Sequence, residues 1–326
     1  MKKEEKHKLI VIGNGLDLSH LLKTSYLHFI KHVIFTHNEK RTVYNDLISV
    51  SGEYYFDDFD DFKYRYIDLE KKEKLRFENQ FFRDLIIELS DNNYNWVDIE
   101  TFYFKKLLEY RESLKMTNKL NQDFENLKKH LENYLYEITE KNDFTYNPLL
   151  INLFIKGGPS HIYFLNFNYT NTLDLYINTL EKIEKKNCSV NHIHGKIKES
   201  SNSPIFGYGN ENEHYKSLLS LDEEYIRFIK SQEYSLTNNY KNLISYLDNN
   251  QNIDVCFIGH SCGESDRTIL NLIVEHENIK SIEISYYPDS SNFRKTHANL
   301  TKAFSTDKFK TKTKSFPDSN IIPQTE

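Results

Sequence analysis

The chain has 326 residues, 38% of them hydrophobic, and its 22 Phe and 23 Tyr help to supply enough apolar surface for a packed core. Its net charge of -6 comes from interspersed acids and bases, which argues against a dedicated nucleic-acid-binding surface. Three cysteines without C-x-x-C spacing exclude a four-cysteine zinc site and disfavour a disulfide framework. No apolar stretch reaches the roughly 18 residues of a membrane span. The charged start is unlike a signal peptide, so we expect a cytoplasmic protein.

Five short apolar runs have the length and composition of strands, and each is followed by polar residues or glycine. They cover residues 8–13, 161–167, 188–194, 254–259 and 281–287. Between them, apolar residues recur with the spacing of amphipathic helices, for example at Leu173, Tyr176, Ile177 and Leu180. Strands that alternate with helices predict an α/β fold with a mostly parallel sheet and helices on both faces.

The segment from about residue 40 to residue 150 breaks this alternation. It has no convincing strand but long patterns of helical period, clearest at Leu120, Phe124, Leu127, Leu131, Leu135 and Ile138. We therefore predict one α/β domain from residues 1–38 and 151–310, a large all-helical insertion over residues 39–150, and a flexible tail over residues 311–326.

The stretch WVDIE within this insertion combines an apolar helical stripe with two carboxylates. Trp96 belongs to the stripe and is assigned to a core. Asp98 and Glu100 are interpreted as carboxylates of a first helical turn, which the helix dipole favours, with membership of a site as the alternative.

The first strand ends on Gly13-Asn14-Gly15 and runs directly into an amphipathic stretch. Glycines at such a turn let the backbone approach a pyrophosphate, whose charge the start of the helix favours. The missing Gly-Lys-Ser/Thr excludes a phosphate-transfer loop, and two glycines leave the usual dinucleotide pattern incomplete. A tight connection without a ligand is the alternative. Asp17 is suited either to cap the helix or to contact a ribose hydroxyl.

Polar residues also follow the next two strands. Asn166 and Asn168 lie on one side of a strand end, where they are suited either to hold a sugar hydroxyl and a water or to form the turn. His192 and His194 are expected to share a strand face, with Gly195 opening access to them. Histidine can take a proton from a sugar hydroxyl or from water. No third ligand stands at a characteristic spacing, which disfavours a metal pair, and a structural role is the plain alternative.

The sequence GHSCG at residues 259–263 matches the G-x-S-x-G elbow of serine hydrolases, and Asp289 and His297 follow in the order of a triad. Only one clear strand follows Ser261, however, which leaves little scaffold to bring that acid and base together. A nucleophilic Ser261 also leaves the opening turn and the asparagines without a role. A binding turn is therefore favoured over an elbow.

Six motifs in this order closely resemble the AbiH-type bacteriophage abortive-infection proteins. They span residue 8 to about residue 290 and read LIVIGNGLDLSHLLKTSYLHFI, WVDIE, FLNFNYTNTLD, HIHG, PIFGYGNE and FIGHSCGESDRTI. More remotely, the glycine turn, the strand-end asparagine, the His-Gly pair and the late Gly-x-Ser turn are similar to a sirtuin-type NAD-binding core. The resemblance implies a Rossmann-like (sirtuin-like) fold for the α/β domain.

The resemblance to sirtuins also implies roles for individual residues. Gly13 and Gly15 would hold the pyrophosphate, Asn168 would sit at the nicotinamide ribose, and His194 would be the catalytic histidine. Gly259 and Ser261 would line the adenosine side. The nucleotide-binding residues expected in this way are Gly13, Asn14, Gly15, Asp17, Tyr169, Gly195, Gly259, Ser261 and Asp266.

The zinc-binding cysteines of deacylating sirtuins are absent, which matches the zinc-free sirtuin-like domains of phage defence that hydrolyse NAD. We therefore expect an antiviral effector that hydrolyses NAD or a related nucleotide at the nicotinamide–ribose bond, without a metal or a prosthetic group. A nucleotide-binding sensor without turnover and a serine hydrolase are the alternatives. A phage-derived trigger and a homo-oligomer are left open, and neither a membrane nor a nucleic acid is expected as a partner.

Overall fold

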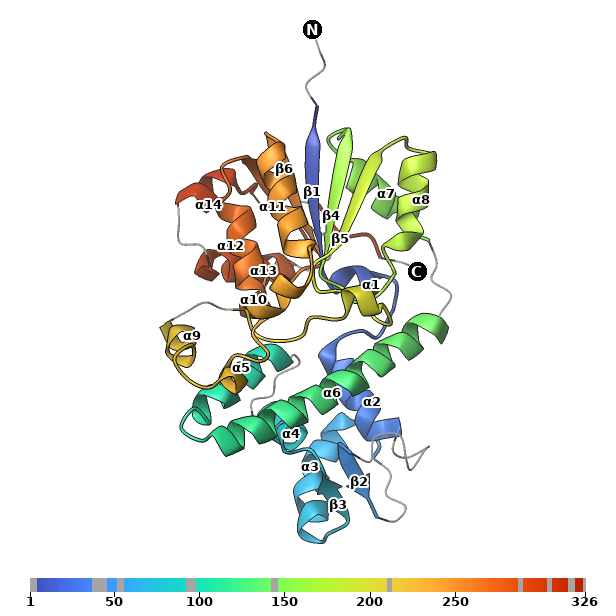
Figure 1. Ribbon diagram of the computed structural model, residues 1–326. Helices are drawn as coiled ribbons and strands as arrows, with labels where there is room; N and C mark the ends of the chain where they lie inside the picture. The colour runs from blue at the N-terminus through green and yellow to red at the C-terminus, as the bar shows by residue number, and fades with distance from the viewer. Residues whose placement is uncertain are drawn as a thin grey trace. The chain divides into compact units, whose positions relative to one another are not determined.

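The computed structural model describes residues 5–36, 46–51, 56–91, 98–141, 146–209, 213–286, 290–303, 307–315 and 320–324 (Figure 1). The chain divides into two compact units. The first, here called the sheet unit, comprises Met1–Leu22, Leu135–Glu211 and Ile229–Glu326. The second, here called the helical unit, comprises Lys23–Tyr134 and Asn212–Phe228. The chain therefore enters the helical unit twice.

The sheet unit is built on five parallel strands, all of which the sequence predicted to within two residues. They are β1 (His7–Ile12), β4 (His161–Asn166), β5 (Asn187–His192), β6 (Ile253–Ile258) and β7 (Ile279–Ser285). Their order across the sheet is β5-β4-β1-β6-β7, and every neighbouring pair is parallel. The predicted α/β class with a parallel, Rossmann-like sheet is confirmed.

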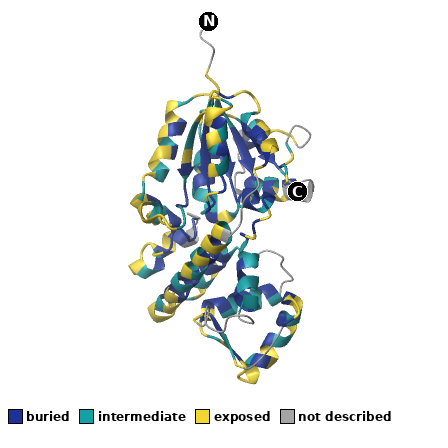
Figure 2. Cartoon of the chain, turned by 90° about the vertical axis from the view of Figure 1, so that its right-hand side faces the viewer, coloured by how far each residue is buried: buried dark blue, intermediate teal, exposed yellow. Residues whose placement is uncertain are grey.

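Helices cover both faces of this sheet because successive side chains of a strand point to opposite sides (Figure 1). In β1, Leu9 and Val11 belong to one buried cluster, and Ile10 and Ile12 belong to the other. The first cluster includes side chains of α11 (Asn239–Asn249), α12 (Arg267–Glu275) and α13 (Ser290–Ala303). The second includes side chains of α7 (Pro148–Ile155) and α8 (Asp174–Lys182). Figure 2 shows continuous burial along the central strands, and five of the six residues are buried in each of β1, β4 and β6.

The other helices of the sheet unit are short, and they are α1 (Gly15–Ser19), η1 (Ser200–Asn202), α10 (Lys230–Glu233), η3 (Tyr234–Leu236), η4 (Glu264–Asp266) and α14 (Asp307–Lys312). Residues beyond 310 were expected to form a flexible tail. In the structure Thr313 bridges Ile282, Ile321 bridges Tyr286, and Ile322 is buried. The described part of this segment packs on the sheet unit, since Ile322 provides an apolar anchor that the basic run KFKTKTK obscured.

The helical unit contains mostly helices but also one pair of strands. Its elements are α2 (Tyr26–Thr36), β2 (Ile48–Val50), α3 (Phe59–Lys71), β3 (Leu75–Phe77), α4 (Gln80–Asp91), α5 (Ile99–Glu109), most of α6 (Leu114–Lys141), α9 (Glu213–Leu218) and η2 (Glu223–Tyr225). The antiparallel pair β2–β3 corrects the prediction of an all-helical insertion. Three residues per strand are too few to show an alternating pattern, which explains the omission.

The helical signals of the insertion are otherwise reproduced. Along α6, five of the six predicted stripe residues are buried, namely Leu120, Phe124, Leu127, Leu131 and Leu135. Asp98 is the N-cap of α5, and its carboxylate accepts hydrogen bonds from the backbone amides of Glu100 and Thr101, both at 3.1 Å. Trp96 lies outside the described residues. No helix of the described residues is long and apolar enough for a membrane span.

The turns that follow β1 and β6 pack directly against each other. The amide of Gly13 donates to the carbonyl of Ile258 at 3.0 Å, and the amide of Gly15 donates to the carbonyl of Gly259 at 2.8 Å. A Cβ atom on Gly259 would lie 2.5 Å from Gly15 Cα, and one on Gly13 would lie 2.5 Å from His260 Cα. The glycines therefore permit this approach. It occurs where the strand order reverses, the usual position of ligands in open parallel sheets.

Replacing Gly259 by alanine should destabilise the protein through this contact. The φ of Gly259 is 63°, and Gly158 provides a matched control, since its φ is 66° and nothing lies within 4 Å of its hypothetical Cβ. We expect Gly158→Ala to cost about 1–2 kcal/mol of unfolding free energy, from the left-handed backbone alone. Gly259→Ala should cost about 1–3 kcal/mol more, from overpacking. Equal losses in urea unfolding would contradict the proposed contact.

Candidate functional site

The predicted site residues lie on the segments that follow β1, β4, β5 and β6, at the carboxyl edge of the sheet. All of them belong to the sheet unit. In the register of β4 and β5, Asn166 pairs with His192. Asn168 and His194 therefore each lie two residues beyond a paired position, on adjacent segments of the same edge.

Asp17 links the first of these segments to the second. It is 1% exposed, and its two carboxylate oxygens accept hydrogen bonds from the hydroxyl of Thr170, both at 2.9 Å. The N-cap position of α1 is held by Asn14 without a side-chain cap. Asp17 thus fastens α1 to the segment after β4, a third role beside the two that the sequence suggested.

The two asparagines after β4 have different partners. The side-chain oxygen Oδ1 of Asn166 accepts a hydrogen bond from the backbone amide of Asn168 at 3.0 Å, which is an Asx-turn. The side-chain amide of Asn168 donates to the carbonyl of Gly13 at 3.1 Å. No described residue hydrogen-bonds Oδ1 of Asn168. Asn166 therefore builds the turn, and Asn168 presents an oriented acceptor at the carboxyl edge.

His192 and His194, at the end of β5 and just beyond it, do not share one face of the strand. His192 is the last residue of β5, and its Nδ1 lies 3.4 Å from the side-chain amide of Asn166. His194 lies beyond the strand, in a turn where the amide of Gly195 donates to the carbonyl of His192 at 2.9 Å. Because β5 ends at His192, the strand alternation that predicted a shared face does not extend to His194.

His194 belongs to a buried cluster around the carboxylate of Asp266, here called the Asp266 cluster. Nε2 of His194 lies 3.2 Å from Oδ1 of Asp266 and 3.1 Å from the hydroxyl of Tyr234. The ammonium of Lys230, whose side chain is 0% exposed, donates to the same Oδ1 at 2.7 Å. Nε2 of His260 lies 3.5 Å from Oδ2 of Asp266. One carboxylate thus holds a lysine and two histidines.

Aromatic contacts hold the two imidazoles of the cluster in place. The Phe167 ring contacts the rings of His194 and His260 edge-on, with centroid distances of 4.8 and 4.3 Å. The Tyr169 ring lies nearly parallel to that of His194 at 6.1 Å, and its hydroxyl donates to the carbonyl of Ile205 at 2.8 Å. Phe167 and Tyr169 flank Asn168 in the sequence, so the Asn168 segment is packed against the cluster.

The electrostatics of the cluster separate its charged groups from its neutral ones. Burial, followed by the charge of the nearby Lys230 ammonium, lowers the pKa of His194 to about 4, although the Asp266 carboxylate acts in the opposite direction. Burial opposes the ionisation of Asp266, but Lys230 and the two histidines outweigh it and hold the pKa of Asp266 well below its usual range. At neutral pH the cluster therefore contains an ionised carboxylate, an ammonium and a neutral His194.

Ser261 does not have the surroundings of a hydrolase nucleophile. It is exposed, and the left-handed residues of this turn are Gly259 and Cys262, with φ of 63° and 53°. An elbow places the strained serine directly between a strand and a helix, whereas α12 begins only at Arg267.

The expected base of that triad, His297, has aromatic neighbours. The ring of His297 packs between those of Phe293 and Phe309, each at a centroid distance of 5.8 Å. Asp289 lies outside the described residues. Gly259 and Ser261 therefore belong to a turn whose backbone contacts Gly15 and Asn299, the latter donating its side-chain amide to the carbonyl of Ser261 at 2.9 Å.

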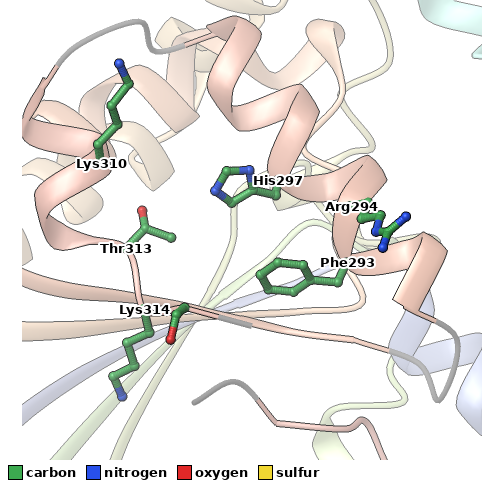
Figure 3. A pocket seen from close by; sticks show the side chains of 7 residues that line it. Phe293, Arg294, His297, Lys310, Thr313 and Lys314 are labelled. Atoms are coloured by element: carbon green, nitrogen blue, oxygen red, sulfur yellow. The ribbon is translucent and has the colours of Figure 1, made fainter. Parts of the chain in front are cut away.

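A separate cavity of about 340 Å³ lies between α13 and the segment around α14 (Figure 3). It is lined by Phe293, Arg294, His297, Lys310, Thr313, Lys314 and Ser315. Figure 3 shows the rings of Phe293 and His297 facing this space, whereas the amino ends of Lys310 and Lys314 point away from it. The cavity contains none of the predicted site residues. Among the described residues, no group of three or more His, Cys, Asp or Glu is arranged to hold a metal ion.

Three members of the Asp266 cluster escaped the sequence analysis, namely Lys230, Tyr234 and His260. Lys230 and Tyr234 lie in a segment without a motif, where α10 and η3 follow the bridge between Tyr208 and Ile229. His260 lies inside GHSCG, a motif that was interpreted through its serine, Ser261. His260 and Asp266 both lie in the short segment after β6, and this closeness in the sequence is the feature that could have suggested their contact.

The neutral state of His194 should make the stability of the protein depend on pH. The pKa of His194 in the folded protein, about 4, lies below its ordinary value of 6.5. As pH falls from about 6.5 to about 4, the unfolded chain therefore binds the proton before the folded protein does, and the free energy of unfolding decreases. Between pH 7 and pH 4.5 this residue alone should remove roughly 2 kcal/mol of unfolding free energy. Urea unfolding at both pH values should therefore show a smaller loss in His194→Asn than in the native protein. Equal losses would contradict the neutral assignment.

Comparison with known proteins gives one match. The family model described as bacteriophage abortive infection AbiH matches residues 9–287. No curated protein and no solved structure matches the chain. The matched range includes the glycine turn, Asn168, His194 and the whole Asp266 cluster. The chain therefore belongs to the bacteriophage abortive infection AbiH family.

Proposed function

We propose that this AbiH family member is an antiviral effector that hydrolyses NAD or a related nucleotide at the nicotinamide–ribose bond. The observation that carries the proposal is the pair formed by Asn168 and His194. An oriented amide and a neutral histidine lie on adjacent segments at the carboxyl edge of a parallel sheet. This is the edge at which open parallel sheets bind their ligands.

The proposed reaction asks little of the protein beyond positioning and the removal of one proton. The bond between nicotinamide and C1′ of the ribose breaks, and nicotinamide leaves as a neutral molecule because its ring carried a positive charge. C1′ passes through an oxocarbenium-like state and is attacked by water. Asn168 would hold the ribose and the water, and neutral His194 would accept the proton that the water loses.

The glycine turn has a different role in this proposal from the one expected at first. The amides of Gly13 and Gly15 already donate to Ile258 and Gly259. They are committed to the contact between the two turns, so we assign no pyrophosphate to them. The turn serves instead as a rigid support for Asn168, whose amide is held by the carbonyl of Gly13. Asn14, Tyr169 and Gly195 remain part of the proposed lining of the site, whereas the buried Asp17 fastens α1 to Thr170.

Nicotinamide release from NAD by the purified protein tests the proposal. We expect His194→Ala to lower the rate at least about 100-fold because it removes the proton acceptor. Asn168→Ala should lower it by about 100-fold through lost positioning. His192→Ala is the comparison variant: this histidine lies outside the Asp266 cluster but contacts the Asn166 side chain and the Asn168 backbone, so its loss should act through positioning alone and lower the rate less than about tenfold.

Two results would contradict this function. One is the absence of nicotinamide release by the native protein, both alone and with phage lysate added. The other is tight binding of the nucleotide without turnover, which would favour the sensor alternative.

A fluorophosphonate probe separates the proposed function from serine hydrolysis. We expect no labelling of Ser261, because this serine is exposed and lies outside the strained positions of its turn. Mass spectrometry of the labelled protein, with Ser261→Ala as control, provides the measurement. A label that is present in the native protein and lost in the variant would reinstate the hydrolase.

A further inference from the structure

The Asp266 cluster places two charged groups, the ammonium of Lys230 and the carboxylate of Asp266, largely out of contact with solvent. Lys230 is entirely buried, His194 is almost so, and the side chain of Asp266 is 13% exposed. Burial of a lysine or an aspartate is costly unless each is paired. Lys230 and Asp266 satisfy this condition through their 2.7 Å contact. The same carboxylate oxygen also faces the imidazole of His194, so the ion pair and the histidine form one unit.

The geometry determines which nitrogen of His194 carries the proton. An ionised carboxylate can only accept hydrogen bonds, and Nε2 of His194 lies 3.2 Å from it. Nε2 therefore holds the hydrogen and donates it to Asp266. In the neutral ring Nδ1 is then the acceptor, and none of the described residues hydrogen-bonds it. The neighbouring His260 is fixed in the same form, because the amide of Cys262 donates to its Nδ1 at 2.9 Å.

We propose that Asp266 and Lys230 are positioning residues for His194, with the carboxylate holding the proton on Nε2 and the ammonium keeping the ring neutral, so that Nδ1 is the atom that accepts the substrate's proton. This inference rests on the proposed function for the identity of the reaction. The tautomer and the protonation state are properties of the protein alone. They can be measured without substrate.

The role of Lys230 follows from the charges that face His194. These are Asp266 on η4, Lys230 on α10 and His260 after β6, with the hydroxyl of Tyr234 on η3. A lone carboxylate next to a histidine stabilises the protonated ring, so that at neutral pH less of the ring is free to accept a proton. The Lys230 ammonium offsets that carboxylate charge. Asp266 can therefore orient His194 without protonating it.

The first experiment determines the tautomer of His194 in the native, full-length protein. Nitrogen NMR of the protein labelled with ¹⁵N-histidine distinguishes a protonated from an unprotonated ring nitrogen, and His194→Gln identifies the signals. We expect a neutral ring with the hydrogen on Nε2 at pH 7 and down to about pH 5. A hydrogen on Nδ1, or a doubly protonated ring at pH 7, would overturn the proposal.

The second experiment removes the charge of Lys230. In Lys230→Met the proton affinity of His194 should rise by at least about tenfold, one pKa unit, because the carboxylate is no longer offset. The acid limb of the rate–pH profile should move upward by the same amount. Lys196→Met is the matched control: Lys196 pairs with Asp174 at 2.7 Å, and its charge lowers the pKa of His192, where burial has the larger effect. It should shift the titration of His192 and leave that of His194 unchanged.

A double variant covers the case in which the single one does not fold. Lys230→Met with Asp266→Leu removes both buried charges together, a change that proteins often tolerate. It should abolish the preference of His194 for the Nε2 tautomer and lower the rate. An unchanged tautomer in this variant would contradict the role of Asp266.

The NMR and rate measurements together separate this inference from the proposed function. A native His194 with the hydrogen on Nε2 in a protein that releases no nicotinamide would refute NAD hydrolysis but leave the positioning role supported. Release of nicotinamide by a protein whose His194 carries the hydrogen on Nδ1 would do the reverse.

Discussion

The close approach of the turns after β1 and β6 is the constraint on which the rest of the site depends. Gly15 donates to Gly259 at 2.8 Å, and a single Cβ atom at Gly259 would overlap Gly15. This contact places the carbonyl of Gly13 where the side chain of Asn168 can donate to it. It also sets the start of the segment that carries His260 and Asp266. A small backbone contact thus positions groups from three strand ends.

The Asp266 cluster shows how a buried charge is retained without being left unpaired. The desolvation of Lys230 and Asp266 is offset by their contact and by the two histidines. Well-packed apolar residues often stabilise a protein as much as a buried ion pair does, so stability alone does not account for such a cluster. Its location beside Asn168, at the edge where parallel sheets bind ligands, is the physical reason to assign it to function.

The family match places the helical unit within the AbiH pattern. The match extends from residue 9 to residue 287, and both segments of the helical unit, Lys23–Tyr134 and Asn212–Phe228, lie inside this range. The helical unit therefore lies within the range that the family model covers. It has its own buried core, including the stacked rings of Tyr103 and Phe124 at 4.1 Å, as expected of a compact unit.

The sequence by itself determined the five strands of the sheet, the helices of the insertion and the family, because apolar periodicity and the order of motifs are local properties of the chain. It also singled out Asn168 and His194, since residues after parallel strands gather at one edge, and Asp266 was expected only from the resemblance to sirtuin-type cores. It missed β2 and β3, which are too short to show a period, and it divided the chain at other residues than the two units do.

Only the tertiary structure decided what these residues contact. It committed the amides of Gly13 and Gly15 to the β6 turn, separated His192 from His194, and brought Lys230, Tyr234 and His260 to Asp266. Lys230 lies 36 residues from Asp266 in the chain, and no local pattern links them. Pairing across such a separation depends on burial and on the requirement that a buried charge find a partner, and both arise only when the chain is packed.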